Sequence, residues 1–243
     1  MAARVFSICF ICHGNRFRSP LAQAFVERLT LGLPAQIQIS TAGTLESQGA
    51  PALPEARQIA VLCGVDLSGH RSQRLSALSL EATDLVIGFE EAHVRRAIVD
   101  AGARRAHAFT FRELVRLVRN FDPAPDLTTV ERARTSVTFG DGLRRRDPAA
   151  VGEHTGVPDP LGRSWKAQLE IAREIRELSL ELAEHLFGVA GSELLLPVPE
   201  KIRRRPRWAW RPLHNRSTRR GPSEALESVP EDVGDQRIEG TRE

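Results

Sequence analysis

The chain has 243 residues, of which 41% are hydrophobic and 27% are charged, with a formal net charge of +3. This composition is typical of a globular protein and excludes a disordered or collagen-like chain as the overall description. No stretch approaches the roughly 18 apolar residues that a transmembrane helix needs, and no signal peptide is recognisable, so we expect a cytoplasmic protein. The three cysteines, Cys9, Cys12 and Cys63, are too few for a disulfide framework.

The first half of the chain alternates between strand and helix patterns. Residues 4–11 form an apolar run rich in β-formers, which is typical of a buried parallel strand. After a loop, Ser19-Pro20 marks the start of a helix that reaches about residue 31. The next predicted elements are strand 36–41, helix 54–63, strand 84–88, helix 90–100, strand 106–110 and a helix that ends before residue 121. This alternation predicts a three-layer α/β fold, in which a four-stranded parallel sheet is flanked by helices.

The second half is less regular. Residues 122–155 contain several prolines and little apolar periodicity, so we predict a long insertion or mobile loop before the final helix. Residues 163–187 carry apolar side chains at helical spacing, which predicts a core helix. From residue 191 the sequence shows no strand or helix periodicity. We therefore predict a domain at 1–190 and a charged, disordered tail at 191–243.

The predicted tail is divided by charge. Residues 201–220 carry nine basic residues and no acid, whereas residues 221–243 carry seven acids and two arginines. Such blocks are usually solvated. Trp208 and Trp210 among the arginines leave open an anionic partner, either a membrane surface or nucleic acid.

The segment from Cys12 to Pro20 carries chemistry. It joins a strand to a helix, so its backbone N–H groups can form a cradle for an anion at the helix N-terminus. That positive field favours the thiolate of Cys12, and the planar guanidinium of Arg18 can bind two phosphoryl oxygens. Gly14 and Asn15 tolerate the positive φ angles of a tight cradle. The pattern indicates phosphoryl transfer through a cysteinyl-phosphate; the alternative is a buried thiol at a strand end.

The chain resembles the low-molecular-weight protein tyrosine phosphatases, which share their fold with a class of arsenate reductases. The family pattern Cys-x-Gly-Asn-x-x-Arg-Ser-Pro, between a strand and a helix, is matched from Val5 to about Glu27. Further matches are Ser-Thr-Ala-Gly-Thr at 40–44, the segment 64–71, and Val-Pro-Asp-Pro at 157–160. The resemblance leaves the predicted insertion and the tail unexplained.

The resemblance implies three catalytic residues. Cys12 would attack phosphorus and Arg18 would bind the equatorial oxygens. Asp159 would protonate the leaving oxygen and then activate water. Asp122 and Asp147 also precede prolines and stay as rivals, but Asp159 has the family's position ahead of the last helix.

The resemblance also implies how the loop is built. Ser19 would donate a hydrogen bond to the Cys12 sulfur, and Asn15 would hold the loop, braced by a hydroxyl of Ser40 or Thr41. The residues expected to bind substrate are His13, Gly14, Asn15, Arg16, Phe17 and Ser19. No metal ion or organic cofactor is expected, and the partner is a phosphorylated protein or a small phosphomonoester.

The sequence departs from the family where the phosphotyrosine ring would lie. Leu161 follows the Asp-Pro pair where the family often has an aromatic residue, and residues 45–48 contain none. His13 and Arg16 replace apolar wall residues. Protein phosphotyrosine is the first substrate hypothesis. A different phosphoamino acid, or a phosphorylated ligand with extra negative charge, stays open.

Two other functions are weighed against hydrolysis. Arsenate reductases of this fold relay a disulfide through two further cysteines beyond the third strand, and no cysteine follows Cys63, so arsenate reduction is not expected. Cys9 and Cys12 should point to opposite faces of their strand. A regulatory module that binds phosphate without turnover stays as an alternative. His70 is expected to be structural, with a hydrogen bond to Glu90.

Overall fold

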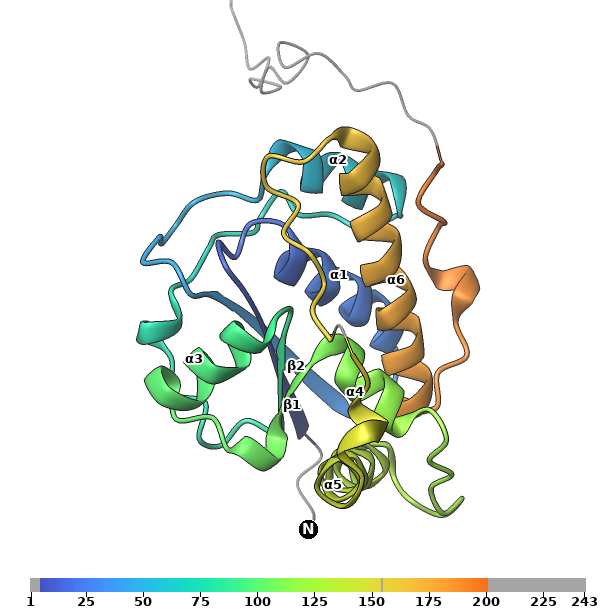
Figure 1. The fold of residues 1–243 in the computed structure, drawn as a ribbon. Helices are drawn as coiled ribbons and strands as arrows, with labels where there is room; N and C mark the ends of the chain where they lie inside the picture. The colour runs from blue at the N-terminus through green and yellow to red at the C-terminus, as the bar shows by residue number, and fades with distance from the viewer. Residues whose placement is uncertain (1–4, 154, 201–243) are drawn as a thin grey trace, which may run out of the picture. The chain divides into compact units, whose positions relative to one another are not determined.

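The structure, a computed structural model, describes residues 5–153 and 155–200. Its sheet consists of the parallel strands β1 (Val5–Cys12), β2 (Gln36–Gly43), β3 (Leu85–Gly88) and β4 (Ala108–Thr110). The strand order is β2-β1-β3-β4, so β1 has a neighbour on each side (Figure 1). The predicted α/β fold is confirmed.

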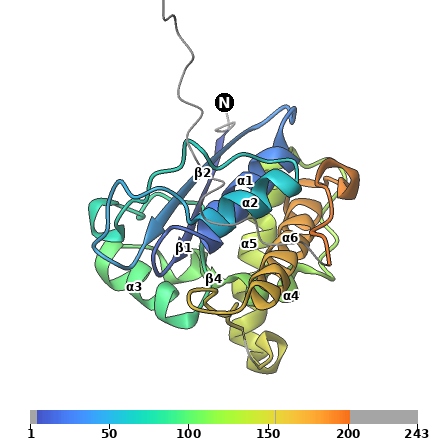
Figure 2. The same ribbon diagram turned by 90° about the horizontal axis from the view of Figure 1, so that it is seen from above.

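Helices cover both faces of this sheet. They are α1 (Arg18–Thr30), α2 (Pro54–Leu62), α3 (Glu91–Ala101), α4 (Phe111–Val118), α5 (Thr129–Arg146) and α6 (Trp165–Phe187). Figure 2 shows α3 on one side of the sheet and α1, α2 and α6 on the other. In the described part of the chain, no helix is both long and apolar enough to cross a membrane.

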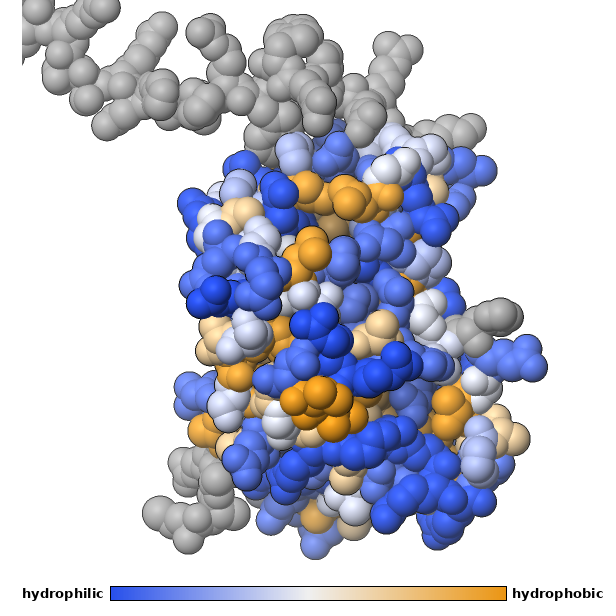
Figure 3. Space-filling model, turned by 60° about the vertical axis from the view of Figure 1, so that its left-hand side comes forward, coloured by the Kyte–Doolittle hydropathy of each residue, from blue (hydrophilic) through white to orange (hydrophobic). Residues whose placement is uncertain are grey.

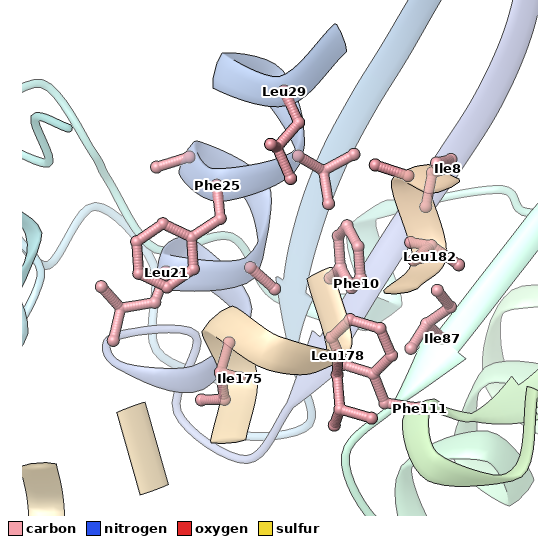
Figure 4. Packing of buried hydrophobic residues seen from close by; sticks show 14 of the residues in the cluster. Ile8, Phe10, Leu21, Phe25, Leu29, Ile87, Phe111, Ile175, Leu178 and Leu182 are labelled. Atoms are coloured by element: carbon pink, nitrogen blue, oxygen red, sulfur yellow. The ribbon is translucent and has the colours of Figure 1, made fainter. Parts of the chain in front are cut away.

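The core has one layer on each face of the sheet. The larger layer joins β1 to α1, α4 and α6, with Phe10 packing against Phe111 at a ring-centroid distance of 5.5 Å (Figure 4). The smaller layer lies under α3. Because side chains alternate along a strand, Cys12 belongs to the larger layer and Cys9 to the smaller one, which confirms that they face apart. All three cysteines are free and buried.

Residues 122–155 do not form the predicted mobile loop. Most of them belong to α5 and to a short 3-10 helix, η3 (Pro148–Val151). Thr128 and Glu131 form a capping box at the start of α5, each side chain accepting from the other's backbone N–H. Mainly small or polar residues make up the buried side of α5: Val130, Ala133, Ser136, Val137, Gly140, Asp141 and Arg144. The helix therefore lacks the apolar periodicity on which the prediction relied.

Helix α5 lies at the sheet edge opposite to Cys12. Arg134 Nη2 donates to the carbonyl oxygen of Val5 at 3.2 Å, and Arg144 Nη1 donates to that of Ala108 at 2.8 Å. Val5 and Ala108 are the first residues of β1 and β4. The segment is thus a packed part of the domain and not a lid over the loop that follows Cys12.

The chain also stays packed beyond residue 190, where we placed the domain boundary. Residues 191–200 run beside α6 (orange in Figure 1) and include the 3-10 helix η4 (Ser192–Leu194). Leu195 and Val198 are buried in the larger core layer, and Leu196 N donates to Cys63 O at 3.2 Å. The predicted boundary is therefore too early. Residues 201–243, with the basic block and its tryptophans, lie outside the described residues.

The surface is mixed in character. Figure 3 shows a face on which hydrophobic residues form separate patches among hydrophilic ones. The large hydrophobic side chains that are exposed among the described residues are Leu31, Leu45, Val61, Val99, Leu161 and Leu196. Two of them, Leu45 and Leu161, flank the loop that follows β1.

Candidate active site

The loop predicted to carry chemistry lies at the carboxyl edge of the sheet. Cys12 is the last residue of β1 and Arg18 is the first residue of α1. The chain leaves β1 to form β2 on one side and later forms β3 on the other, and such switch points of parallel sheets are where ligands bind. Cys12 and Arg18 are 2% and 1% exposed, so both reactive groups lie at the base of the loop.

Asn15 organises the loop through its side chain. It takes a positive φ of 50°, while Gly14 does not. Asn15 Oδ1 accepts from Gln73 N at 2.8 Å, which fixes the orientation of the amide because a backbone N–H can only donate. Asn15 Nδ2 then donates to Ser19 Oγ at 2.8 Å. Ser19 Oγ lies 3.1 Å from Cys12 Sγ, so its own proton is free to point at the sulfur, as the resemblance implied.

The bracing of Asn15 differs from the expectation. Gln73 and His70, rather than a hydroxyl of Ser40 or Thr41, hold it. His70 Nε2 donates to Asn15 O at 2.7 Å. Ser40 Oγ instead donates to Ile8 O at 3.3 Å. The predicted bond between His70 and Glu90 is therefore also wrong. Burial lowers the pKa of His70, so its ring is neutral at pH 7. Its proton lies on Nε2, because a carbonyl oxygen can only accept.

Arg18 binds two carboxylates and one carbonyl. Its Nη1 donates to Glu90 Oε1 and, at 3.0 Å, to Val157 O, while its Nη2 donates to Asp159 Oδ2 at 2.7 Å. Val157 N in turn donates to Phe89 O at 2.7 Å, which ties the loop of Asp159 to the end of β3. The structure thus brings Asp159 to Arg18.

The rival Asp147 is not part of this cluster. It ends α5, and its Oδ1 accepts from Ala149 N at 3.1 Å. Glu90 was missed as a site residue by sequence reasoning. Its position two residues after the end of β3, at the carboxyl edge of a parallel sheet, was the available signal.

The loop encloses a small pocket of about 110 Å³. It is lined by Cys12, His13, Gly14, Arg16, Phe17, Arg18, Leu45, Leu53, Asp159, Pro160 and Leu161. Leucines therefore form the walls where the family often has aromatic rings. Arg16 Nε donates to Pro51 O at 2.8 Å, and His13 Nδ1 lies 3.2 Å from Thr44 Oγ1, so both polar loop residues are anchored beside the pocket.

His93 lies next to this cluster on α3 and is 4% exposed. Burial, together with the positive charge of Arg18, lowers the pKa of His93 to about 4. The ring is therefore neutral at pH 7. Within residues 5–153 and 155–200, no group of three or more His, Cys, Asp or Glu side chains could hold a metal ion.

Comparison with known proteins places these features in a family. Residues 7–131, just over half of the chain, match the family described as low molecular weight phosphotyrosine protein phosphatase. The chain belongs to this family. It is accordingly a phosphatase of the low-molecular-weight type, a class of hydrolases. The match ends before Asp159, so the part of that residue is argued from geometry.

Relatives within the family carry two kinds of name. A probable low molecular weight protein-tyrosine-phosphatase, EpsP of Ralstonia nicotianae, is 30% identical over 138 residues, 55% of this chain and 90% of the relative. A protein-arginine-phosphatase of Bacillus subtilis is 25% identical over 179 residues, 74% of this chain and 95% of the relative. The low molecular weight phosphatase structure from T. tengcongensis shares the fold, with a TM-score of 0.53, 24% identity, and 74% and 98% of the two chains covered.

Proposed function

We propose that this phosphatase hydrolyses phosphomonoesters through a cysteinyl-phosphate on Cys12, with Arg18 as the phosphate ligand and Asp159 as the acid and base. The supporting observation is that Arg18, six residues beyond Cys12 at the start of α1, binds the Asp159 carboxylate at 2.7 Å. A nucleophile, a guanidinium fork and a proton donor thus meet at one pocket. A module that only bound phosphate would not need the proton donor.

The first step forms the phosphoenzyme. A phosphoryl group in the loop replaces the carboxylates on Arg18, which then binds two of its oxygens. The Cys12 thiolate attacks phosphorus, so that the S–P bond forms as the bond to the ester oxygen breaks. Asp159, protonated at this stage, gives its proton to the leaving oxygen.

The second step releases phosphate. Asp159, now a carboxylate, takes a proton from a water molecule whose oxygen bonds to phosphorus. The S–P bond breaks and its electron pair returns to sulfur. Ser19 donates to that sulfur and stabilises the thiolate as it leaves.

For the substrate, we propose a phosphorylated side chain of a protein, with phosphotyrosine first. Family membership and the EpsP relative support this choice. Phosphoarginine is the second candidate. A relative named as a protein-arginine-phosphatase supports it, as does the pair of carboxylates, Glu90 and Asp159, that already binds a guanidinium at the pocket.

The catalytic proposal is tested by hydrolysis of p-nitrophenyl phosphate between pH 5 and 8. We expect no turnover in Cys12→Ser and a loss of about 10²-fold or more in kcat for Asp159→Ala. Asp147→Ala is the matched control, since Asp147 also precedes a proline but lies at the opposite edge, and it should keep wild-type activity. Turnover by Cys12→Ser, or equal losses in the two aspartate variants, would refute the assignment.

The substrate is tested with peptides of one sequence that carry phosphotyrosine, phosphoarginine or phosphoserine. The highest kcat/KM is expected for phosphotyrosine. A higher value for phosphoarginine would replace it as the substrate. Phosphate-dependent binding of all three peptides without turnover, in folded wild type and in Cys12→Ser alike, would favour the binding module over the enzyme.

A further inference from the structure

A wider hollow adjoins the catalytic pocket along α3. Its volume is about 560 Å³, about five times that of the pocket, and the two share His13, Leu45 and Asp159 as lining residues. The other residues that line it are Thr44, Glu90, Ala92, His93, Arg95 and Arg96. Whatever is attached to a phosphate in the loop can therefore pass over the three shared residues into the hollow.

The hollow offers positive charge that is not used within the described chain. Arg95 is exposed, and its guanidinium forms neither a salt bridge nor a hydrogen bond with any residue of 5–153 or 155–200. Arg96 also lines the hollow but is paired with Asp100 through its Nε. Both arginines lie in the first turns of an 11-residue helix, whose N-terminal end adds a further positive potential.

The acidic groups that face the hollow are already bound. In the resting site, Glu90 and Asp159 both accept hydrogen bonds from Arg18, whose single positive charge offsets part of their negative charge. Arg95 lies farther along α3 and has no such compensation. An incoming anion therefore meets its most favourable partner at Arg95.

A buried polar group points to the same conclusion. His93 lines the hollow, is 4% exposed, and its Nδ1 has no hydrogen-bond partner among the described residues. Its ring is neutral at pH 7 because burial lowers its pKa to about 4, so it can donate an N–H without adding charge. Buried polar atoms without partners are rare, and a ligand is one way to satisfy them.

We propose that this hollow is a second subsite, which binds a carboxylate of an acidic residue close to the phosphorylated residue of a protein substrate. Arg95 supplies the charge, and Thr44 and His93 supply hydrogen-bond donors. This inference rests on the proposed function and adds the substrate's sequence context to it. The same chemistry could bind a second phosphate on a small molecule, and the test separates the two sources.

The experiment compares two phosphotyrosine peptides that differ only in flanking residues, glutamate in one and alanine in the other. Wild type should have a kcat/KM about fivefold higher for the acidic peptide, through KM. Arg95→Ala should weaken this preference and Arg95→Glu should abolish it, with hydrolysis of p-nitrophenyl phosphate unchanged. Arg104→Glu, an exposed arginine that lines neither hollow, is the matched control and should keep the preference.

Three results would overturn the subsite. The first is the same kcat/KM for the two peptides in wild type, and the second is a loss of preference in Arg104→Glu as large as that in Arg95→Glu. The third is a loss of p-nitrophenyl phosphate turnover in Arg95→Glu as large as its loss of turnover of the acidic peptide. An aryl bisphosphate and its monophosphate form the second arm. A preference confined to the bisphosphate would overturn the peptide carboxylate as the occupant.

The outcome stays separable from that of the proposed function. If wild type hydrolyses none of these compounds, hydrolysis is refuted, and the subsite is then tested by the binding of the fluorescein-labelled peptides to Cys12→Ser. Tighter binding of the acidic peptide, lost in the Cys12→Ser/Arg95→Glu double variant, would support the subsite. Equal binding of both peptides would refute it.

Discussion

At the scale of single residues, the direction of one short chain of hydrogen bonds determines what the loop can do. Gln73 N can only donate, so it fixes Asn15 Oδ1 as the acceptor and Asn15 Nδ2 as the donor to Ser19. The Ser19 proton is then left for Cys12 Sγ. The backbone N–H of Gln73 thereby determines the direction in which the Ser19 hydroxyl donates.

Ser19→Ala tests this chain. Hydrogen bonds to charged groups contribute about 1.5–3 kcal/mol, so loss of the donor to the thiolate should lower kcat about 10- to 100-fold. The measurement is steady-state hydrolysis of p-nitrophenyl phosphate. Ser68→Ala is the control, because Ser68 is exposed and, in the described chain, its hydroxyl bonds only to Asp66, two residues before it. A kcat within twofold of wild type in Ser19→Ala would contradict the assignment.

His93 should make the stability of the protein depend on pH. Its pKa is about 4 in the folded protein, below the ordinary 6.5, because burial disfavours the charged ring. Between pH 6.5 and 4 the unfolded chain therefore binds a proton that the folded chain does not, and stability falls by up to about 3 kcal/mol as the pH drops. Above pH 6.5 the effect vanishes.

Urea unfolding at pH 7, 6 and 5 measures this dependence. His93→Gln should lose less stability than wild type over that range, because it removes one group that titrates. His70, whose pKa burial also lowers, is common to both proteins and cancels in the comparison. If the unfolding free energy fell equally with pH in the two proteins, His93 would be excluded as a source of the pH dependence.

At the scale of elements, the sequence reveals an element when its buried side is apolar. The run 4–11 predicted β1, and the helical stripe of 163–187 predicted α6, because both bury large hydrophobic side chains. Helix α5 escaped prediction because small and polar residues, Gly140 and Arg144 among them, make up its buried side. Its capping box, Thr128 and Glu131, and the three arginines of its last turn were the local signals present.

Arg144 should be the most sensitive position of α5. It pairs with Glu113 at 3.3 Å and Asp141 at 2.8 Å, and all three side chains are at most 10% exposed. Its removal leaves the buried Glu113 carboxylate without an ion pair and takes one of two arginines from Asp141, so Arg144→Ala should cost about 3–5 kcal/mol of unfolding free energy. Arg145→Ala is a matched control, since Arg145 pairs with the same Asp141 but is 72% exposed, and it should cost under about 1 kcal/mol.

Urea unfolding of both variants decides between a buried network and a solvated helix. Equal, small losses would mean that the Arg144 pairs contribute no more than surface pairs do. Because α5 lies at the edge of the sheet opposite to Cys12, activity per folded molecule should stay unchanged in both variants.

In the candidate site, too, contacts between residues close in the sequence were predictable, whereas contacts between distant residues were not. The sequence alone places Cys12, Arg18 and Ser19 in one short segment, since Ser19 is seven positions beyond Cys12. Glu90, by contrast, reaches Arg18 across 72 positions. Its contact depends on where β3 ends beside β1, which no local pattern encodes. The bracing of Asn15 by Gln73 and His70 was missed for the same reason.

At the scale of the whole molecule, we propose that the catalytic domain includes residues 191–200. Arg176 Nη2 donates to Leu195 O at 2.6 Å, and Leu195 is 1% exposed among core residues. This stretch contains two prolines and two glutamates, and it lacks helical or strand periodicity, although two of its apolar side chains pack in the core beside α6. A boundary drawn by composition alone therefore removes part of the domain.

Two adjacent leucines test this boundary. Leu195→Ala should cost about 2–5 kcal/mol of unfolding free energy, because it leaves a cavity in the core. Leu196→Ala should change stability by under about 0.5 kcal/mol, since Leu196 is 55% exposed. Urea unfolding measures both. Equal effects would mean that the segment adds no core packing and that the domain ends near residue 190.

The double pairing of Arg18 also bears on how a catalytic cycle closes. Inorganic phosphate, once formed, must leave the guanidinium fork that held it through the reaction. Glu90 and Asp159 stand beside that fork as tethered competitors for the same N–H groups. Their return to Arg18 would expel the product, so that inorganic phosphate inhibits weakly, and its inhibition constant should fall in Glu90→Gln, where one competitor has lost its charge. The contacts of Arg18 with Glu90 and Asp159 in the free enzyme would thus also promote product release.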